Sequence, residues 1–272
     1  MTPKEVFQDS FRIAELLLYL HRLLENDGLV TQGEMVGKLR EMLKTAPDEQ
    51  LQLVLNSVFL GCIREDAGVP SATLRPQSLS NLLRQAVVSG CTAYETYLST
   101  LLARHIFTVI ELKQHEFFPN DPEVVKYFDG LSFSIGEAFR LLSLEERSVL
   151  LGTKIVAFVQ KKNLGSVAGL KTVGLLLGID EPWNQVALHL NREVKEVRRL
   201  VADCIERRNA IVHKADRKIE DERMEKQPIA YAWTRQAVDT IGHVCLAFDE
   251  LAAERIKHYQ EALDARKDTI HA

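Results

Sequence analysis

The chain has 272 residues, of which 46% are hydrophobic, so it can bury a substantial core as one large domain or two small ones. A net charge of −4 argues against a nucleic-acid footprint over the whole molecule, although a local basic patch remains compatible with it. No apolar run reaches the roughly 18 residues that cross a bilayer, and the four cysteines are scattered without a CxxC pair. We therefore expect a protein of the cytoplasm with reduced cysteines, no membrane contact, and neither a metal site nor a cofactor.

Apolar residues recur every three or four positions along nearly the whole chain, which predicts an all-α fold. The first predicted helix spans 11–24 and ends at Asn26-Asp27-Gly28, where a turn is favoured. Further helices are predicted over 31–44 and 47–64. The Gly- and Pro-containing stretch 65–78 then predicts a boundary between an N-terminal helical extension, residues 1–75, and a helical domain, residues 76–272.

The second part of the chain begins with a long predicted helix over 79–112, followed by an irregular segment, 114–130, that contains two prolines. Two helices are then predicted from capping-box spacings, Ser134 with Glu137 and Ser143 with Glu146. Asp180 before Pro182 predicts the start of another helix that runs into the sequence RRNAIVHKAD, residues 207–216. The charged run 215–228 predicts a solvated connection to a final helix over 229–266.

The second arginine of RRNAIVHKAD occupies an unexpected place. At about 100° per residue, Arg208 falls in the centre of an apolar stripe on its helix, whereas Arg207 points to the surface. Asn209 and His213 lie four residues apart on one edge of that stripe. Three interpretations of Arg208 stay open: an ion pair within the chain, for which Glu95 is a candidate, a contact with a second subunit, and a phosphate site.

These residues resemble a known family. The sequence RNAIVH, with Arg208, Asn209 and His213 at the end of a long helix, resembles the signature of HEPN ribonucleases, in particular the RiboL-PSP-HEPN-like branch. The segment 83–102 is similar to the first core helix of that family, in which Glu95 to Leu98 match an E-x-Y/F-L pattern. The resemblance covers roughly residues 79–266 and implies an up-and-down helical bundle.

The resemblance also implies a function. It implies a homodimer whose two motifs form a composite site for RNA, with His213 as general acid or base and Arg208 on the scissile phosphate. Asn209 would orient these groups and Glu95 would support Arg208. The implied reaction is metal-independent cleavage that leaves a 2′,3′-cyclic phosphate, in a toxin–antitoxin or phage-defence setting with a possible antitoxin or defence-system partner. The alternative is a catalytically inactive HEPN module that binds nucleotides or proteins.

Other candidate sites carry less specific patterns. The sequence NLGSVAGLKTVG, residues 163–174, resembles a phosphate loop but has Leu170 between its second glycine and Lys171, so we interpret it as a closely packed helix–helix turn at Gly165 and Gly169. The eight histidines show no HExxH spacing, and His105 is interpreted as a packed core histidine. The aromatic pairs at 117–118 and 127–128 are interpreted as packing of the irregular segment, with base stacking as the alternative.

Overall fold

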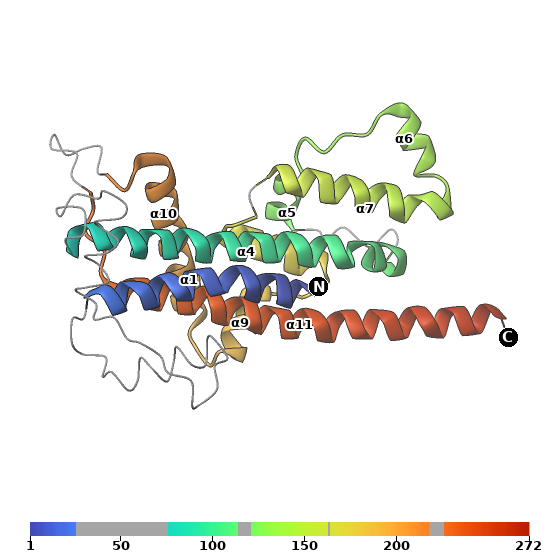
Figure 1. Ribbon diagram of the computed structural model, residues 1–272. Coiled ribbons are helices and arrows are strands. Elements are labelled where there is room, and N and C mark those ends of the chain that lie inside the picture. The colour runs from blue at the N-terminus through green and yellow to red at the C-terminus, as the bar shows by residue number, and fades with distance from the viewer. Residues whose placement is uncertain (26–75, 114–120, 163, 218–225, 272) are drawn as a thin grey trace, which may run out of the picture.

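The computed structural model describes residues 1–25, 76–113, 121–162, 164–217 and 226–271. Within these ranges the chain is an all-α helical bundle without strands, which confirms the predicted fold class (Figure 1). The predicted helices over 31–44 and 47–64 lie outside the described residues, as does most of the predicted boundary. The division at residue 75 therefore stays a prediction.

Three long helices form the bundle: α1 (Pro3–Glu25), α4 (Pro76–Lys113) and α11 (Tyr231–His271). The helix α1 begins well before the predicted residue 11, because Thr2 caps it and bonds reciprocally with Glu5. In the bundle α1 runs opposite to α4, as the bond from Arg104 to the carbonyl of Met1 requires. The helices α4 and α11 run in the same direction rather than alternating (Figure 1).

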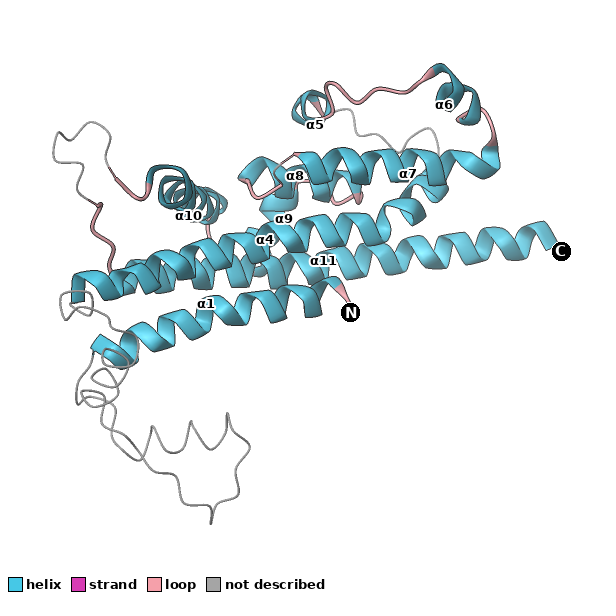
Figure 2. Cartoon of the chain, turned by 45° about the horizontal axis from the view of Figure 1, so that its top comes forward, coloured by secondary structure: helices cyan, strands magenta, loops and turns pink. Residues whose placement is uncertain are grey.

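The main hydrophobic core lies between α4, α11 and the shorter helices packed on them (Figure 2). Each fully buried large side chain there contributes about 1.5–3 kcal/mol to stability. The largest of these are contributed by α1, α4 and α11: Phe7, Tyr94, Tyr97, Leu98 and Phe248. The long helix α4 is central because it contacts both other long helices and also α7, α8 and α10.

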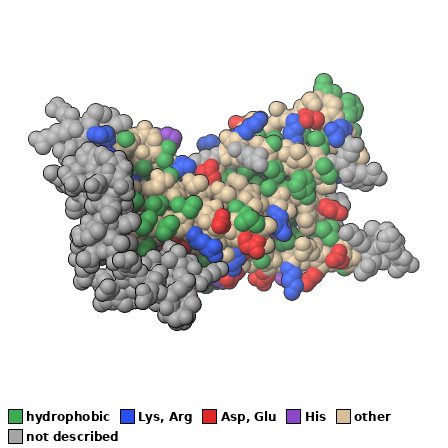
Figure 3. Space-filling view, in the orientation of Figure 1, with side chains coloured by type: hydrophobic (Ala, Val, Ile, Leu, Met, Phe, Trp, Pro, Cys, Tyr) green, Lys and Arg blue, Asp and Glu red, His purple; other side chains and the backbone are tan. Residues whose placement is uncertain are grey.

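The middle of the chain forms an arm of three helices: α5 (Pro122–Tyr127), α6 (Ile135–Arg140) and α7 (Leu144–Lys161). The predicted capping box of Ser134 and Glu137 is present at the start of α6. At the start of α7, Ser143 is the N-cap as predicted but makes no side-chain cap bond. The helix α6 has no buried residue, and hydrophobic side chains are visible at the surface where it lies (Figure 3).

The predicted helix from residue 180 into the motif is wrong, because the chain forms two helices there. These are α9 (Pro182–His189) and α10 (Val194–Lys214). Asn191 between them has a φ of 51°, a left-handed conformation that a continuous helix cannot contain. The apolar periodicity continues across this turn, which explains the error. The helix α8 (Val167–Leu176) precedes them and packs on α9.

The helix α10 crosses α4 near the end of the bundle where α4 begins, rather than running alongside it (Figures 1 and 2). Its first half is anchored by four buried residues: Val197, Leu200, Val201 and Cys204. Beyond Cys204 the helix has no fully buried residue, although Ile205 and Ile211 still pack against the core, and Val212 is 49% exposed. The residues of the motif therefore lie on the part of α10 that is only partly covered.

Candidate functional site

The predicted pairing of Arg208 with Glu95 is present in the structure. A terminal nitrogen of Arg208 donates to Oε2 of Glu95 across the crossing of α10 and α4, at 3.4 Å. Its other terminal nitrogen donates to Oδ1 of Asn209 at 3.0 Å. The structure thus brings together Arg208, Asn209 and Glu95, three of the four residues named from the sequence.

The sequence placed Arg208 at the centre of the apolar stripe, whereas the structure places it at the edge of the buried surface. Its side chain is 18% exposed and that of Glu95 is 30% exposed, so the ion pair is in contact with solvent. The Nε of Arg208 is buried and has no hydrogen-bond partner among the described residues. An unpaired buried donor costs about 1–3 kcal/mol, and the Nε of the neighbouring Arg207 is in the same state.

His213 lies in the last turn of α10, four residues after Asn209, and both side chains are exposed. Its imidazole makes no hydrogen bond or ion pair with the part of the chain that the structure describes. The five-residue spacing from Arg208 corresponds to about 7.5 Å along the helix axis and about 140° around it. The imidazole is therefore free to exchange a proton with a bound molecule.

Arg207 is not the surface residue that helical periodicity predicted. Its side chain is 16% exposed, and one terminal nitrogen donates to Oδ2 of Asp216 at 2.9 Å. The same nitrogen reaches the backbone carbonyls of Gln227 and Pro228, and the other reaches the side chain of Gln227. The chain after α10 returns over this face of the helix and covers Arg207, which a helical projection cannot anticipate.

Asp216 and Arg84 complete this cluster, and sequence reasoning missed both. The carboxylate of Asp216 is fully buried, and its Oδ2 also accepts from Nε of Arg84 at 2.5 Å. Arg84 lies on α4 and donates further to Ser80 and to the carbonyl of Gln227. A signal existed, because Arg84 shares the apolar side of α4 with Val87 and Cys91.

The charged run 215–228 is therefore only partly solvated. Its residues 218–225 lie outside the described structure, but both flanks return to the bundle, as Asp216 and Gln227 show. The amide of Gln227 donates to the carbonyl of Asp216 at 2.7 Å. The backbones of Arg217 and Lys226 form an isolated antiparallel β-bridge. We define the buried cluster as Arg84, Arg207, Asp216 and Gln227.

Two cysteine thiols lie directly beneath the Arg208–Glu95 pair, one helical turn before each of its members. The sulfur atoms of Cys91 and Cys204 are 3.5 Å apart, and both side chains are buried. The hydrogen bond with Cys91, followed by burial, raises the pKa of the Cys204 thiol well above its usual value. These cysteines pack as small apolar groups at the helix crossing.

The buried thiols should resist alkylation in the folded protein. Burial also raises the pKa of the Cys245 thiol, so the reactive thiolate is scarce at neutral pH as well as inaccessible. In a Cys62→Ser background we expect iodoacetamide to leave Cys91, Cys204 and Cys245 unmodified until the protein is denatured. Mass spectrometry after timed exposure measures this, with the guanidinium-denatured protein as the control. Rapid alkylation of Cys204 in the folded state would contradict the packing described.

The remaining candidates from the sequence are structural where the structure describes them. A Cβ on Gly169 would lie 2.0 Å from the carbonyl oxygen of Leu164, so the glycine-rich stretch is a close-packed turn and helix start, as interpreted. Phe128 is buried and stacks on Phe158. His105 is half-buried, and its pKa is lowered by burial and then by Arg104. Residues 117–118 lie outside the described structure.

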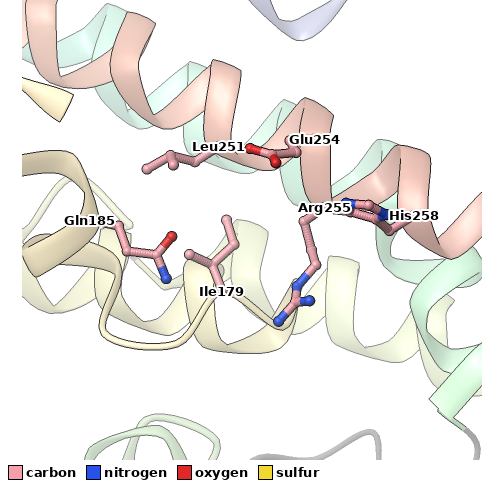
Figure 4. Close-up of a pocket in the computed structure, with 6 residues that line it drawn as sticks. All are labelled: Ile179, Gln185, Leu251, Glu254, Arg255 and His258. Atoms are coloured by element: carbon pink, nitrogen blue, oxygen red, sulfur yellow. The ribbon is translucent and has the colours of Figure 1, made fainter. Parts of the chain in front are cut away.

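A groove of about 240 Å³ lies elsewhere, between α11 and the start of α9 (Figure 4). It is lined by Ile179, Gln185, Leu251, Glu254, Arg255 and His258, none of which belongs to the motif. Among the described residues no group of His, Cys, Asp or Glu side chains could hold a metal ion. No described helix combines the length and apolar character needed to span a membrane.

Comparison with known proteins adds no identification. No family model, curated protein or solved structure matches this chain. The function is therefore proposed from the geometry around Arg208 and from the resemblance of the sequence RNAIVH to the HEPN motif.

Proposed function

We propose that this chain is a metal-independent endoribonuclease of the HEPN type, with its site at Arg208, Asn209 and His213 and with Glu95 in support. The observation that carries the proposal is the half-covered ion pair between Arg208 and Glu95, with an exposed imidazole five residues later on the same helix. A guanidinium that is held by a carboxylate and still touches solvent suits a phosphate ligand. An accessible histidine within one and a half turns supplies a proton acceptor.

The proposed reaction is an internal transesterification. The 2′-oxygen of a ribose attacks the adjacent phosphorus, and His213 accepts the hydroxyl proton as the new P–O bond forms. Arg208 stabilises the additional negative charge on the phosphoryl oxygens in the transition state. The P–O5′ bond then breaks and the protonated His213 returns its proton to the leaving 5′-oxygen, which leaves a 2′,3′-cyclic phosphate and a 5′-hydroxyl.

Glu95 and Asn209 prepare the arginine for this role. Both side chains accept hydrogen bonds from terminal nitrogens of Arg208, which restricts the guanidinium to one orientation before RNA binds. Holding a binding group in place in advance reduces the entropy that is lost when the transition state forms. A phosphate would compete with Glu95 for the guanidinium, whose contact with the carboxylate is 3.4 Å long, at the upper end of hydrogen-bond distances.

We include a homodimer in the proposal, with the motifs of two subunits facing one composite cleft. Val212 is 49% exposed beside the motif, and a partner subunit would cover it. Sedimentation at micromolar concentration should then show a species near twice the 30.8 kDa of one chain. A monomer at all accessible concentrations would remove the composite cleft, while cleavage at a single-subunit site would still be possible.

The experiment that tests the proposed activity is incubation of a mixed RNA pool with the protein in excess EDTA. We expect the RNA to be cut at the same rate as in buffer with magnesium, because no step uses a metal. Cleavage only with metal would contradict the mechanism. Intact RNA under both conditions would favour the alternative, an inactive module that binds nucleotides or proteins. The toxin–antitoxin or phage-defence setting, the cytoplasmic location and an antitoxin or defence-system partner belong to the same proposal.

A further inference from the structure

The helix α10 ends in a strained conformation just after His213. Ala215 and Asp216 have φ angles of 50° and 60°, in the left-handed region that residues other than glycine rarely adopt. The amide of Asp216 turns back to the carbonyl of Ala210 at 2.9 Å, which closes the last turn of the helix. Two consecutive left-handed residues without glycine persist only where surrounding contacts hold them.

The contacts that hold this end are those of the buried cluster. The carboxylate of Asp216 accepts from Arg84 on α4 and from Arg207 on α10, and its backbone carbonyl accepts from the amide of Gln227. Asp216 thus joins three segments of the chain: the start of α4, the end of α10 and the residues before α11. Among the described residues, Asp216 is the only carboxylate that contacts these two arginines, and its side chain is fully buried.

The two neighbouring arginines of the motif consequently fix α10 at two separate points. Arg208 contacts Glu95, whereas Arg207 contacts Asp216, which is bonded to Arg84. Arg84 and Glu95 are eleven residues apart on α4, or about 16 Å along the helix. These contacts tie the end of α10 to α4 at two places. His213 lies in the last turn of α10, which the amide of Asp216 closes.

We infer that Asp216 is a positioning residue for His213, acting through Arg84 and Arg207 rather than by contact with RNA. This inference rests on the proposed ribonuclease function and adds to it a buried residue outside the motif. Without the carboxylate, Arg84 and Arg207 would be left close together with a buried surplus of positive charge. The strained turn would also lose the two ion pairs that hold Asp216 in place. The last turn of α10 would then fray, while the Arg208–Glu95 pair would remain.

The test is Asp216→Asn, which keeps the size of the side chain and its tolerance of the left-handed region but removes the charge. We expect kcat for RNA cleavage to fall about 100-fold, because a displaced proton acceptor is costly, while KM stays within about threefold. The matched control is Asp203→Asn, which removes an exposed carboxylate paired with Arg199 on the same helix and should leave both constants unchanged. Equal loss in kcat and affinity, or an unchanged kcat, would overturn the inference.

A second readout does not depend on activity. Hydrogen–deuterium exchange of the amides between Ala210 and Asp216 should accelerate at least about tenfold in Asp216→Asn and not in Asp203→Asn, because local opening governs exchange. If the wild-type protein cuts no RNA, the proposed function fails, and this exchange result still decides whether Asp216 holds the helix end. Should Asp216→Asn fail to fold, Arg84→Lys retains the charge but loses the forked guanidinium. The same changes in kcat and exchange, in milder form, are then expected, and their absence would refute the inference.

Discussion

Replacing His213 by alanine should lower the rate of RNA cleavage by about 10²–10⁴-fold, because the reaction then lacks its positioned proton acceptor. Arg208→Ala should lower the rate by about 10²–10³-fold, since the charge that develops on the phosphoryl oxygens loses its hydrogen-bond donor. Single-turnover cleavage of a labelled RNA measures both effects. The protein should remain folded in each case, because His213 is exposed and Arg208 lies at the margin of the core.

Matched variants separate chemistry from charge and from general damage. Arg208→Lys keeps the positive charge but cannot form the paired hydrogen bonds of a guanidinium, so it should recover only part of the lost rate. Glu95→Gln should lower the rate less than Arg208→Ala does, because Asn209 still orients the arginine. His243→Ala removes an exposed histidine on α11 and should leave the rate unchanged. Cleavage that survived both His213→Ala and Arg208→Ala would place the active site elsewhere.

The adjacent arginines should differ sharply in their contribution to stability. Arg207→Ala should lower the free energy of unfolding by about 3 kcal/mol, because it leaves the buried carboxylate of Asp216 with one partner and removes a hydrogen bond from the carbonyl of Pro228, whereas the carbonyl of Gln227 keeps Arg84. Arg208→Ala should cost about 1 kcal/mol or less, since it breaks one long ion pair with a partly exposed carboxylate and one bond to its neighbour.

Urea denaturation of the two variants beside the wild type measures this difference as a shift in midpoint at constant slope. The side chains of the two arginines are similarly exposed, at 16% and 18%, so burial alone predicts equal losses. A difference of about 2 kcal/mol or more between the two losses would show that the contribution of each arginine to stability depends on the number and burial of its partners. Equal losses would mean that Asp216 is satisfied by Arg84 without Arg207.

The sequence predicted what depends on the register of single helices. The all-α class and the long helix that became α4 follow from apolar periodicity, whereas the contact between Arg208 and Glu95, which are 113 residues apart, was one of three interpretations that the sequence left open. The capping box at Ser134 followed from a local spacing that needs no tertiary information. Such features are fixed by residues that are near one another in the chain.

Two predictions from the sequence were wrong: the exposure of Arg207 and the continuity of the helix across Asn191. Arg207 pointed away from the stripe of its own helix, yet residues 216 and 227 fold back over it and bury it. The turn at Asn191 interrupts a helix whose apolar pattern continues on both sides. The burial of Arg207 could not be predicted from periodicity, because it depends on where a distant segment packs. The turn at Asn191 has a local signal instead, since asparagine tolerates the left-handed conformation that ends a helix. The partnership of Arg84 and Asp216 spans 132 residues and has no local signal beyond a charged residue on an apolar face.

We propose that residues at the exposed end of α10 promote RNA cleavage in which a 2′-hydroxyl of the RNA attacks the adjacent phosphorus. The most direct measurement is end-group analysis of RNA fragments formed by the wild-type protein in EDTA, with DNA of the same sequence as the control. The account predicts a 2′,3′-cyclic phosphate on each upstream fragment, a 5′-hydroxyl on each downstream fragment, and intact DNA. Fragments with 5′-phosphates, or cleavage of the DNA, would contradict it.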